Sequence, residues 1–126
     1  MSRIQKAFEN KKAFIAFLTA GDPSLDKTEE YILEMERAGA DLIEIGIPFS
    51  DPIAEGLVIQ EADIRALSGG VTTDDIFDMV KKLREKTEIP LVFMTYLNPV
   101  FHYGYEAFFE RCQDVGIDGI IIPDPV

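Results

Sequence analysis

The residue with the clearest chemical potential is Glu44, a carboxylate inside the otherwise apolar run Leu42–Ile47. If that run is a β-strand, its side chains alternate between two faces, and Glu44 shares a face with Leu42 and Gly46. A carboxylate on such a face is costly unless a partner pairs with it or the face opens into a pocket. Glu44 is therefore either a structural residue bonded to a neighbouring helix or loop, or a general acid/base that faces a substrate.

Two more carboxylates, Asp51 and Glu55, follow in the loop of residues 48–56. Two prolines stiffen this loop, and it leaves the carboxyl end of the strand, where parallel α/β folds place their active sites. The spacing of the acids matches no specific magnesium pattern, and one His with one Cys does not make a zinc site. Taken without Glu44, the loop favours a structural interpretation, in which Ser50 or Asp51 caps a turn and Glu55 is solvated. The alternatives are acid/base chemistry together with Glu44, or a magnesium site.

The elements that must position these acids are strands and helices in alternation. Apolar runs at residues 13–19, 42–47, 90–96 and 119–124 alternate with segments of helical spacing at 26–38, 57–67, 73–83 and 105–115. This alternation predicts a parallel sheet with helices packed over it. A closed eight-stranded barrel needs roughly 250 residues. The chain of 126 residues therefore predicts one α/β unit, either a small open sheet or half of a barrel.

Composition excludes several classes of function. Twelve Lys and Arg against 23 Asp and Glu give a net charge of −11, which disfavours nucleic acid and anionic membrane surfaces as partners. No apolar run approaches the roughly 18 residues of a membrane span. Cys112 is the single cysteine, so no intramolecular disulfide forms, and a reducing cytoplasm is the expected compartment.

The motif Leu-Ile-Glu-Ile-Gly-Ile-Pro-Phe-Ser-Asp-Pro at residues 42–52 closely resembles the tryptophan synthase alpha subunit family. Gly-Asp-Pro at 21–23 and Met-Thr-Tyr-Leu-Asn-Pro at 94–99 fit the same family. The resemblance implies a TIM (βα)₈ barrel with an added N-terminal helix near residues 2–10, and residues 1–126 would be its N-terminal half with the first four strands. It also implies a lyase of tryptophan biosynthesis. Such an enzyme cleaves indole-3-glycerol phosphate to indole and glyceraldehyde 3-phosphate, a retro-aldol reaction with no cofactor of its own.

The same resemblance implies roles for individual residues. Glu44 matches the essential acid/base, which protonates the indole ring at C3 and assists loss of the side-chain hydroxyl proton. Glu55 matches the second catalytic acid, which stabilises charge at the indole N–H, although the family usually has the shorter Asp there. Five residues match positions that line the indole pocket: Phe17, Ile59, Met94, Tyr96 and Ile121. Asp51 and Pro52 match the loop that meets the beta subunit of an alpha2beta2 tetramer, in which pyridoxal phosphate serves the condensation of indole with serine.

The resemblance also limits what the chain is expected to do alone. The family holds the substrate phosphate with backbone N–H groups of the last barrel loops, so the 126-residue chain is expected to be inactive by itself. The unpaired edge of its fourth strand is expected to promote self-association. Two alternatives stay open. One is a non-catalytic half-barrel module for assembly or folding, and the other is a stand-alone indole-3-glycerol-phosphate lyase that needs no beta subunit.

Overall fold

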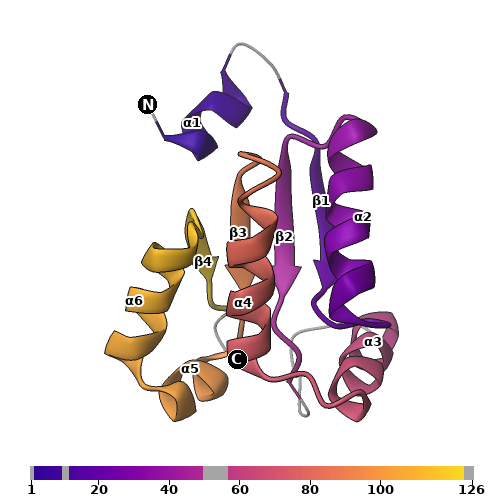
Figure 1. Ribbon diagram of the computed structural model, residues 1–126, viewed down its shortest axis with the longest axis vertical. Helices are drawn as coiled ribbons and strands as arrows, with labels where there is room; N and C mark the ends of the chain where they lie inside the picture. The colour runs from indigo at the N-terminus through magenta and orange to yellow at the C-terminus, as the bar shows by residue number, and fades with distance from the viewer. Residues whose placement is uncertain (1, 10–11, 50–56, 124–126) are drawn as a thin grey trace.

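The computed structural model describes residues 2–9, 12–49 and 57–123, and its centre is a parallel sheet in the order β1-β2-β3-β4 (Figure 1). The strands are β1 (Ile15–Thr19), β2 (Leu42–Gly46), β3 (Leu91–Met94) and β4 (Gly119–Ile121). Each strand lies inside one of the four predicted apolar runs. The predicted α/β architecture with a parallel sheet is therefore confirmed.

The helices largely follow the predicted spacing. They are α1 (Arg3–Phe8), α2 (Leu25–Arg37), α3 (Leu57–Ser68), α4 (Thr73–Leu83), α5 (Leu97–Tyr103) and α6 (Tyr105–Val115). The N-terminal helix expected from the family resemblance is α1. The short helix α5 was not predicted, because Pro99 suggested a loop. Pro99 lies in the first turn of α5, where a missing N–H breaks no helical hydrogen bond.

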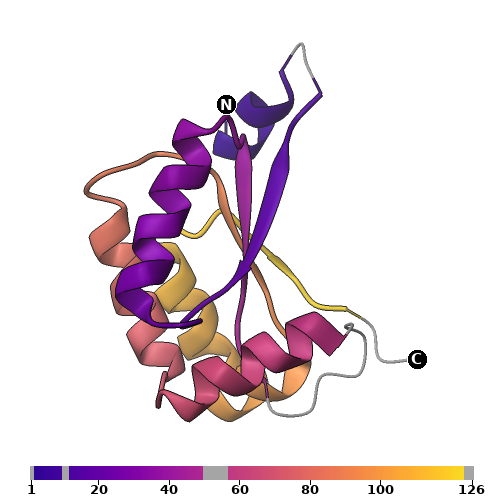
Figure 2. The same ribbon diagram turned by 90° about the vertical axis from the view of Figure 1, so that its right-hand side faces the viewer.

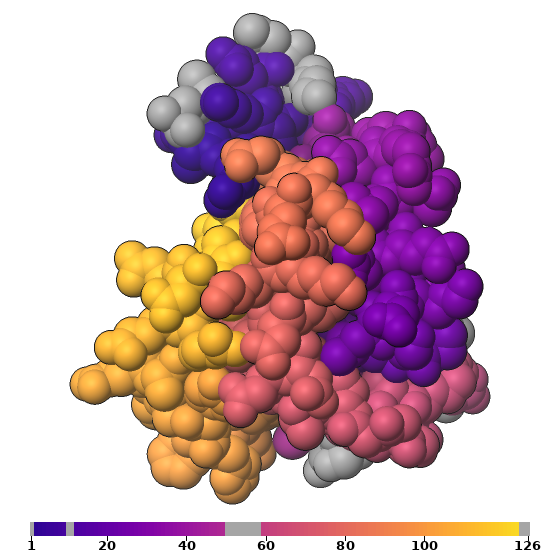
Figure 3. Space-filling view, in the orientation of Figure 1, coloured from indigo at the N-terminus to yellow at the C-terminus, as the bar shows by residue number. Residues whose placement is uncertain are grey.

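One face of the sheet forms the hydrophobic core. Four strand residues on this face are fully buried: Ile43, Ile45, Leu91 and Phe93. α2, α4 and α6 pack over them on that side of the sheet (Figures 1 and 3). The Phe77 ring of α4 meets Phe93 and Phe108 at centroid distances of 5.7 and 5.3 Å. Burial of these large apolar side chains fixes the helices on the sheet.

We call the opposite side of the sheet the open face. Among the described helices, α1 lies near it at the N-terminal end of the strands, and α3 begins on this side at their C-terminal end (Figure 2). The strand register arranges its residues in rows. From the N-terminal to the C-terminal end, these rows are Ile15–Leu42, then Phe17–Glu44–Val92–Gly119, then Thr19–Gly46–Met94–Ile121. Sequence alternation had placed Glu44 with Leu42 and Gly46, and the structure confirms that arrangement.

A network around Asp118 holds the N-terminal edge of the sheet together. One carboxylate oxygen of Asp118 accepts a hydrogen bond from Arg3 of α1 at 2.9 Å. The other accepts from Arg84 at 2.8 Å and from the backbone N–H of Leu91 at 2.9 Å. Arg84 also donates to backbone carbonyls, including that of Gly116, and its burial lowers the pKa of its guanidinium. The N-terminal ends of the strands therefore carry interactions that stabilise the fold, and the C-terminal ends remain free to hold a functional site.

The C-terminal edge of the sheet is flanked by α3 and α5 (Figure 1). Arg65 of α3 donates two hydrogen bonds, of 2.9 and 3.0 Å, to the carboxylate of Asp22 in the loop after β1. This bidentate pair ties α3 to the carboxyl end of β1.

Candidate active site

The candidate site centres on Glu44, in the middle of the open face. Its nearest strand neighbours are Phe17 of β1 and Val92 of β3. Glu44 is half-buried, and it is the only ionisable residue in the four strands. Within the described part of the chain, no hydrogen bond or ion pair engages its carboxylate. The structural interpretation, in which a neighbouring helix or loop bonds Glu44, therefore finds no support among the described residues.

The Phe17 ring forms an apolar surface next to this carboxylate. A Cβ atom added to Gly46 would lie only 2.8 Å from Cζ of Phe17, so the ring lies directly over the Gly46 backbone. Glycine at position 46 is what allows this close approach. The ring is half-buried and remains accessible from the open face. Phe17 and Glu44 thus place a flat apolar surface and a carboxylate side by side.

Two other predicted pocket residues lie on the same face. Met94 and Ile121 are direct neighbours in the row that also contains Gly46. Met94 is half-buried, and Ile121, at the edge of the sheet, is 43% exposed. The structure therefore brings Phe17, Met94 and Ile121 onto one surface with Glu44.

Tyr96 and Ile59 come from the elements at the C-terminal edge. Tyr96 lies beyond the end of β3, where it is the N-cap residue of α5, and it is 7% exposed. Its ring contacts that of Phe49 at a centroid distance of 5.4 Å. The half-buried Ile59 is in the first turn of α3, and that helix begins on the open-face side of the sheet (Figure 2).

Sequence reasoning missed two neighbours of the predicted residues. Phe49, which packs on Tyr96, directly follows Pro48, beyond the end of β2, where the alternation of the strand no longer applies. Val92 lies beside Glu44, and it reads as an ordinary strand residue until the register between β2 and β3 is known. Three predicted site residues, Asp51, Pro52 and Glu55, lie outside the described residues.

Other kinds of site find little support in the described part of the chain. No group of three or more His, Cys, Asp or Glu side chains there is arranged to hold a metal ion. None of the helices described is long and apolar enough to cross a membrane. Cys112 is buried in the core. His102 is exposed and lies in α5.

The sequence profile of the tryptophan synthase alpha chain family matches residues 4–125. The chain belongs to this family. A curated tryptophan synthase alpha chain from Alkaliphilus metalliredigens is 59% identical over 115 residues, which are 91% of this chain and 43% of the relative. One from Lacticaseibacillus casei is 48% identical over 124 residues, which are 98% of this chain and 47% of the relative. The chain thus spans about half the length of the curated relatives it matches.

Solved structures agree with this assignment. Tryptophan synthase subunit alpha from Legionella pneumophila matches with a TM-score of 0.94 and 42% identity over 98% of this chain and 50% of that one. A chain of the tryptophan synthase complex from Pyrococcus furiosus matches with a TM-score of 0.85 and 42% identity, over 89% of this chain and 46% of that one. These neighbours are TIM barrels, and the four strands correspond to about half of one. Of the two predicted architectures, the half-barrel is therefore the correct one.

Proposed function

We propose that this chain supplies the N-terminal half of an active site that cleaves indole-3-glycerol phosphate to indole and glyceraldehyde 3-phosphate. The observation that carries the proposal is Glu44, a carboxylate without a partner among the described residues, beside the Phe17 ring on the open face. In a member of the tryptophan synthase alpha chain family, this arrangement suits a flat apolar ring that must be protonated.

The retro-aldol reaction explains why one carboxyl group is central. Protonation of the indole ring at C3 prepares the bond between C3 and the side-chain carbon for cleavage. When that bond breaks, its electron pair returns to the ring, and the side-chain hydroxyl loses its proton as the aldehyde forms. One proton is gained and one is lost, with no net oxidation, so no cofactor is required. Glu44 can deliver the first proton and accept the second.

Other residues complete the proposed site. Glu55 stabilises charge at the indole N–H, and five residues enclose the ring: Phe17, Ile59, Met94, Tyr96 and Ile121. The substrate phosphate binds in the C-terminal half of the barrel, so residues 1–126, as a single half-barrel unit, do not turn over substrate alone.

The proposed protein partner is a tryptophan synthase beta chain. Among the similar solved structures are chains of the tryptophan synthase a2b2 complex of Pyrococcus furiosus. In this chain, the loop with Asp51 and Pro52 would meet the beta chain, and pyridoxal phosphate would belong to that partner alone.

A chimera tests the proposal. Residues 1–126 are joined to the C-terminal half of the Legionella pneumophila alpha subunit, and indole release from indole-3-glycerol phosphate is measured. We expect indole from the chimera and none from the 126-residue chain alone. A chimera that folds, as judged by circular dichroism, but releases no indole would support a non-catalytic assembly module instead.

The same assay tests the proposed role of Glu55 and the proposed partnership with a beta chain. Glu55→Asp should keep or raise the rate, because it restores the family's usual residue, whereas Glu55→Ala should nearly abolish it. Equal rates for Glu55→Ala and the parent chimera would show that Glu55 is only a solvated residue.

Added beta chain should raise the rate of indole release by the chimera. A rate that does not respond to beta chain would favour a stand-alone lyase.

A further inference from the structure

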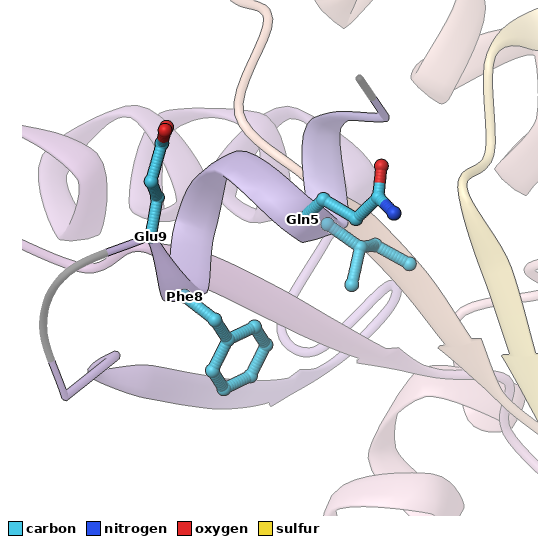
Figure 4. A pocket seen from close by; sticks show the side chains of 4 residues that line it. Gln5, Phe8 and Glu9 are labelled. Carbon is cyan, nitrogen blue, oxygen red and sulfur yellow. The ribbon is translucent and has the colours of Figure 1, made fainter.

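A described helix lies at each end of the open face. At the N-terminal end of the strands, a hollow of about 540 Å³ opens next to α1 (Figure 4). Among the described residues its lining comes only from α1 and the residue that caps it: Ile4, Gln5, Phe8 and Glu9. At the C-terminal end, α3 begins on the open-face side and carries Ile59 in its first turn (Figure 2). α3 is therefore the described helix that can place a side chain over a ring bound near the carboxyl ends of the strands.

α3 owes little of its position to the hydrophobic core. None of its described side chains belongs to the core between the sheet and α2, α4 and α6. Its buried apolar residues, among those described, are Ala62 and Ala66, and small side chains bury little apolar area. Of the described elements, β1 is the one on which α3 packs most extensively. The orientation of α3 therefore depends on its contacts at the end of β1.

Two contacts connect the C-terminal end of α3 to the loop after β1. Arg65, in the last turn of α3, donates from Nε and Nη2 to the two carboxylate oxygens of Asp22, at 2.9 and 3.0 Å. Beyond the helix, the Val71 side chain lies over Gly21, because a Cβ atom added to Gly21 would be only 3.1 Å from it. A bidentate pair fixes the relative direction of its two groups as well as their distance. The Arg65 pair therefore sets the angle of α3 on the sheet.

The loop that receives these contacts is itself held in place. The hydroxyl of the buried Thr28 in α2 accepts a hydrogen bond from the backbone N–H of Gly21 at 2.9 Å. The same hydroxyl donates to the carbonyl of Ser24 at 2.8 Å. The Asp22 side chain is 18% exposed and that of Arg65 is 56% exposed. Asp22 is therefore the fixed partner, and Arg65 is the partner that a substitution can remove with little damage to the loop.

On the basis of the proposed function, we infer that Arg65 is a positioning residue, which acts through Asp22 to hold Ile59 over the apolar ring of the substrate. Ile59 is six positions before Arg65, which corresponds to about 9 Å along a helix axis. A tilt of about 10° at the Arg65 end would therefore move Ile59 by about 1.5 Å. A shift of that size removes much of the dispersion attraction between a side chain and the ring that it covers.

Loss of this clamp should weaken substrate binding more than the chemical step. Ile59 would cover the ring before and during the reaction, so its contact contributes affinity without favouring the transition state. In the chimera, Arg65→Ala should raise the KM for indole-3-glycerol phosphate about tenfold, the effect of about one lost methylene contact. The kcat should change by less than about threefold. Arg65→Lys keeps the charge but loses the bidentate geometry, so it should recover only part of the affinity.

A role in stability alone predicts a different result. Partial unfolding reduces the amount of active enzyme, so it lowers the apparent kcat and leaves KM unchanged. The matched control is Arg37→Ala on α2, because Arg37 also pairs with a carboxylate, that of Glu34, and its side chain is 65% exposed. This control should leave KM unchanged. An active Arg65→Ala chimera with the parent KM would overturn the inference and leave the proposed function intact.

A double-mutant cycle tests whether Arg65 acts through Ile59. Ile59→Ala removes the side chain that Arg65 is inferred to position. In that background, Arg65→Ala should therefore have little further effect on KM. If the two separate effects on KM multiply in the double variant, Arg65 acts elsewhere and the inference is refuted.

Hydrogen exchange measures the hold of Arg65 on α3 without any activity. In the 126-residue chain, Arg65→Ala should raise the exchange rates of the α3 amides about three- to tenfold, because the helix opens more often when the pair is lost. The amides of α2 and α4 should exchange as in the parent chain. A folded parent chimera that releases no indole would refute the proposed function, whereas unchanged exchange in α3 would refute the clamp itself.

Discussion

We expect the substitution Asp118→Ala to be among the most destabilising single changes at the N-terminal edge of the sheet. The side chains of Asp118 and Arg84 are only 11% and 10% exposed, and they form an ion pair at 2.8 Å. Removal of one partner of a buried pair costs about 3–5 kcal/mol. Arg84 keeps its bonds to the carbonyls of Gly116, Thr87 and Ile89, which reduces the loss. The amide of Leu91 loses its acceptor, which adds about 1 kcal/mol.

The sum of these effects is about 3 kcal/mol, a large share of the stability of a small domain. With a urea dependence of about 2 kcal/mol per M, the unfolding midpoint should fall by about 1.5 M. Circular dichroism follows the transition at one fixed protein concentration, because association would add to the apparent stability.

A matched control separates this effect from a general effect of removing a carboxylate. Asp78 also pairs with an arginine, Arg111, at 3.0 Å, but its side chain is 71% exposed. Asp78→Ala should therefore cost less than about 1 kcal/mol. Equal midpoint shifts for the two variants would refute the claim that the Asp118 network holds this edge.

Two further predictions concern the core and the open face. Gly46→Ala should destabilise the chain by about 1–3 kcal/mol because its methyl group meets the Phe17 ring at 2.8 Å, and Phe17→Leu should recover part of the loss. Gly119→Ala, whose methyl group has no contact closer than 3.5 Å, should be tolerated, and urea unfolding of the three variants checks the order. Burial raises the pKa of the Cys112 thiol from 9.0 to about 12, so the unfolded chain ionises first and stability is lost as pH rises above 9. The loss is about 1 kcal/mol at pH 10, and a Cys112→Ala variant should lack this component of the pH dependence.

The fold could be predicted because short stretches of sequence are enough to identify most of its strands and helices. Each strand is a short continuous apolar run, and the alternation of side chains alone placed Glu44 on one face with Leu42 and Gly46. The helix α5 was missed because Pro99 reads as a break, although a proline in the first turn is compatible with a helix.

The site was predictable in part. Its individual residues came from the family resemblance, and the structure places Phe17, Met94 and Ile121 on the face of Glu44. The approach of the Phe17 ring to Gly46 depends on the register between β1 and β2, which no local pattern reveals. The Asp118 network was equally hidden, because Arg3 and Asp118 are 115 positions apart in the sequence. The roles of Glu44 and of the loop acids remain predictions.

The most direct test of the proposed function is the rate of indole release by the chimera with Glu44→Gln. Glutamine keeps the shape of the side chain but cannot exchange a proton, so we expect the rate to fall by roughly 10²–10⁴-fold. Glu110→Gln makes the same chemical change at an exposed position of α6 and should leave the rate unchanged. A folded Glu44→Gln chimera that keeps more than about a tenth of the parent rate would contradict the assignment of Glu44 as the acid/base.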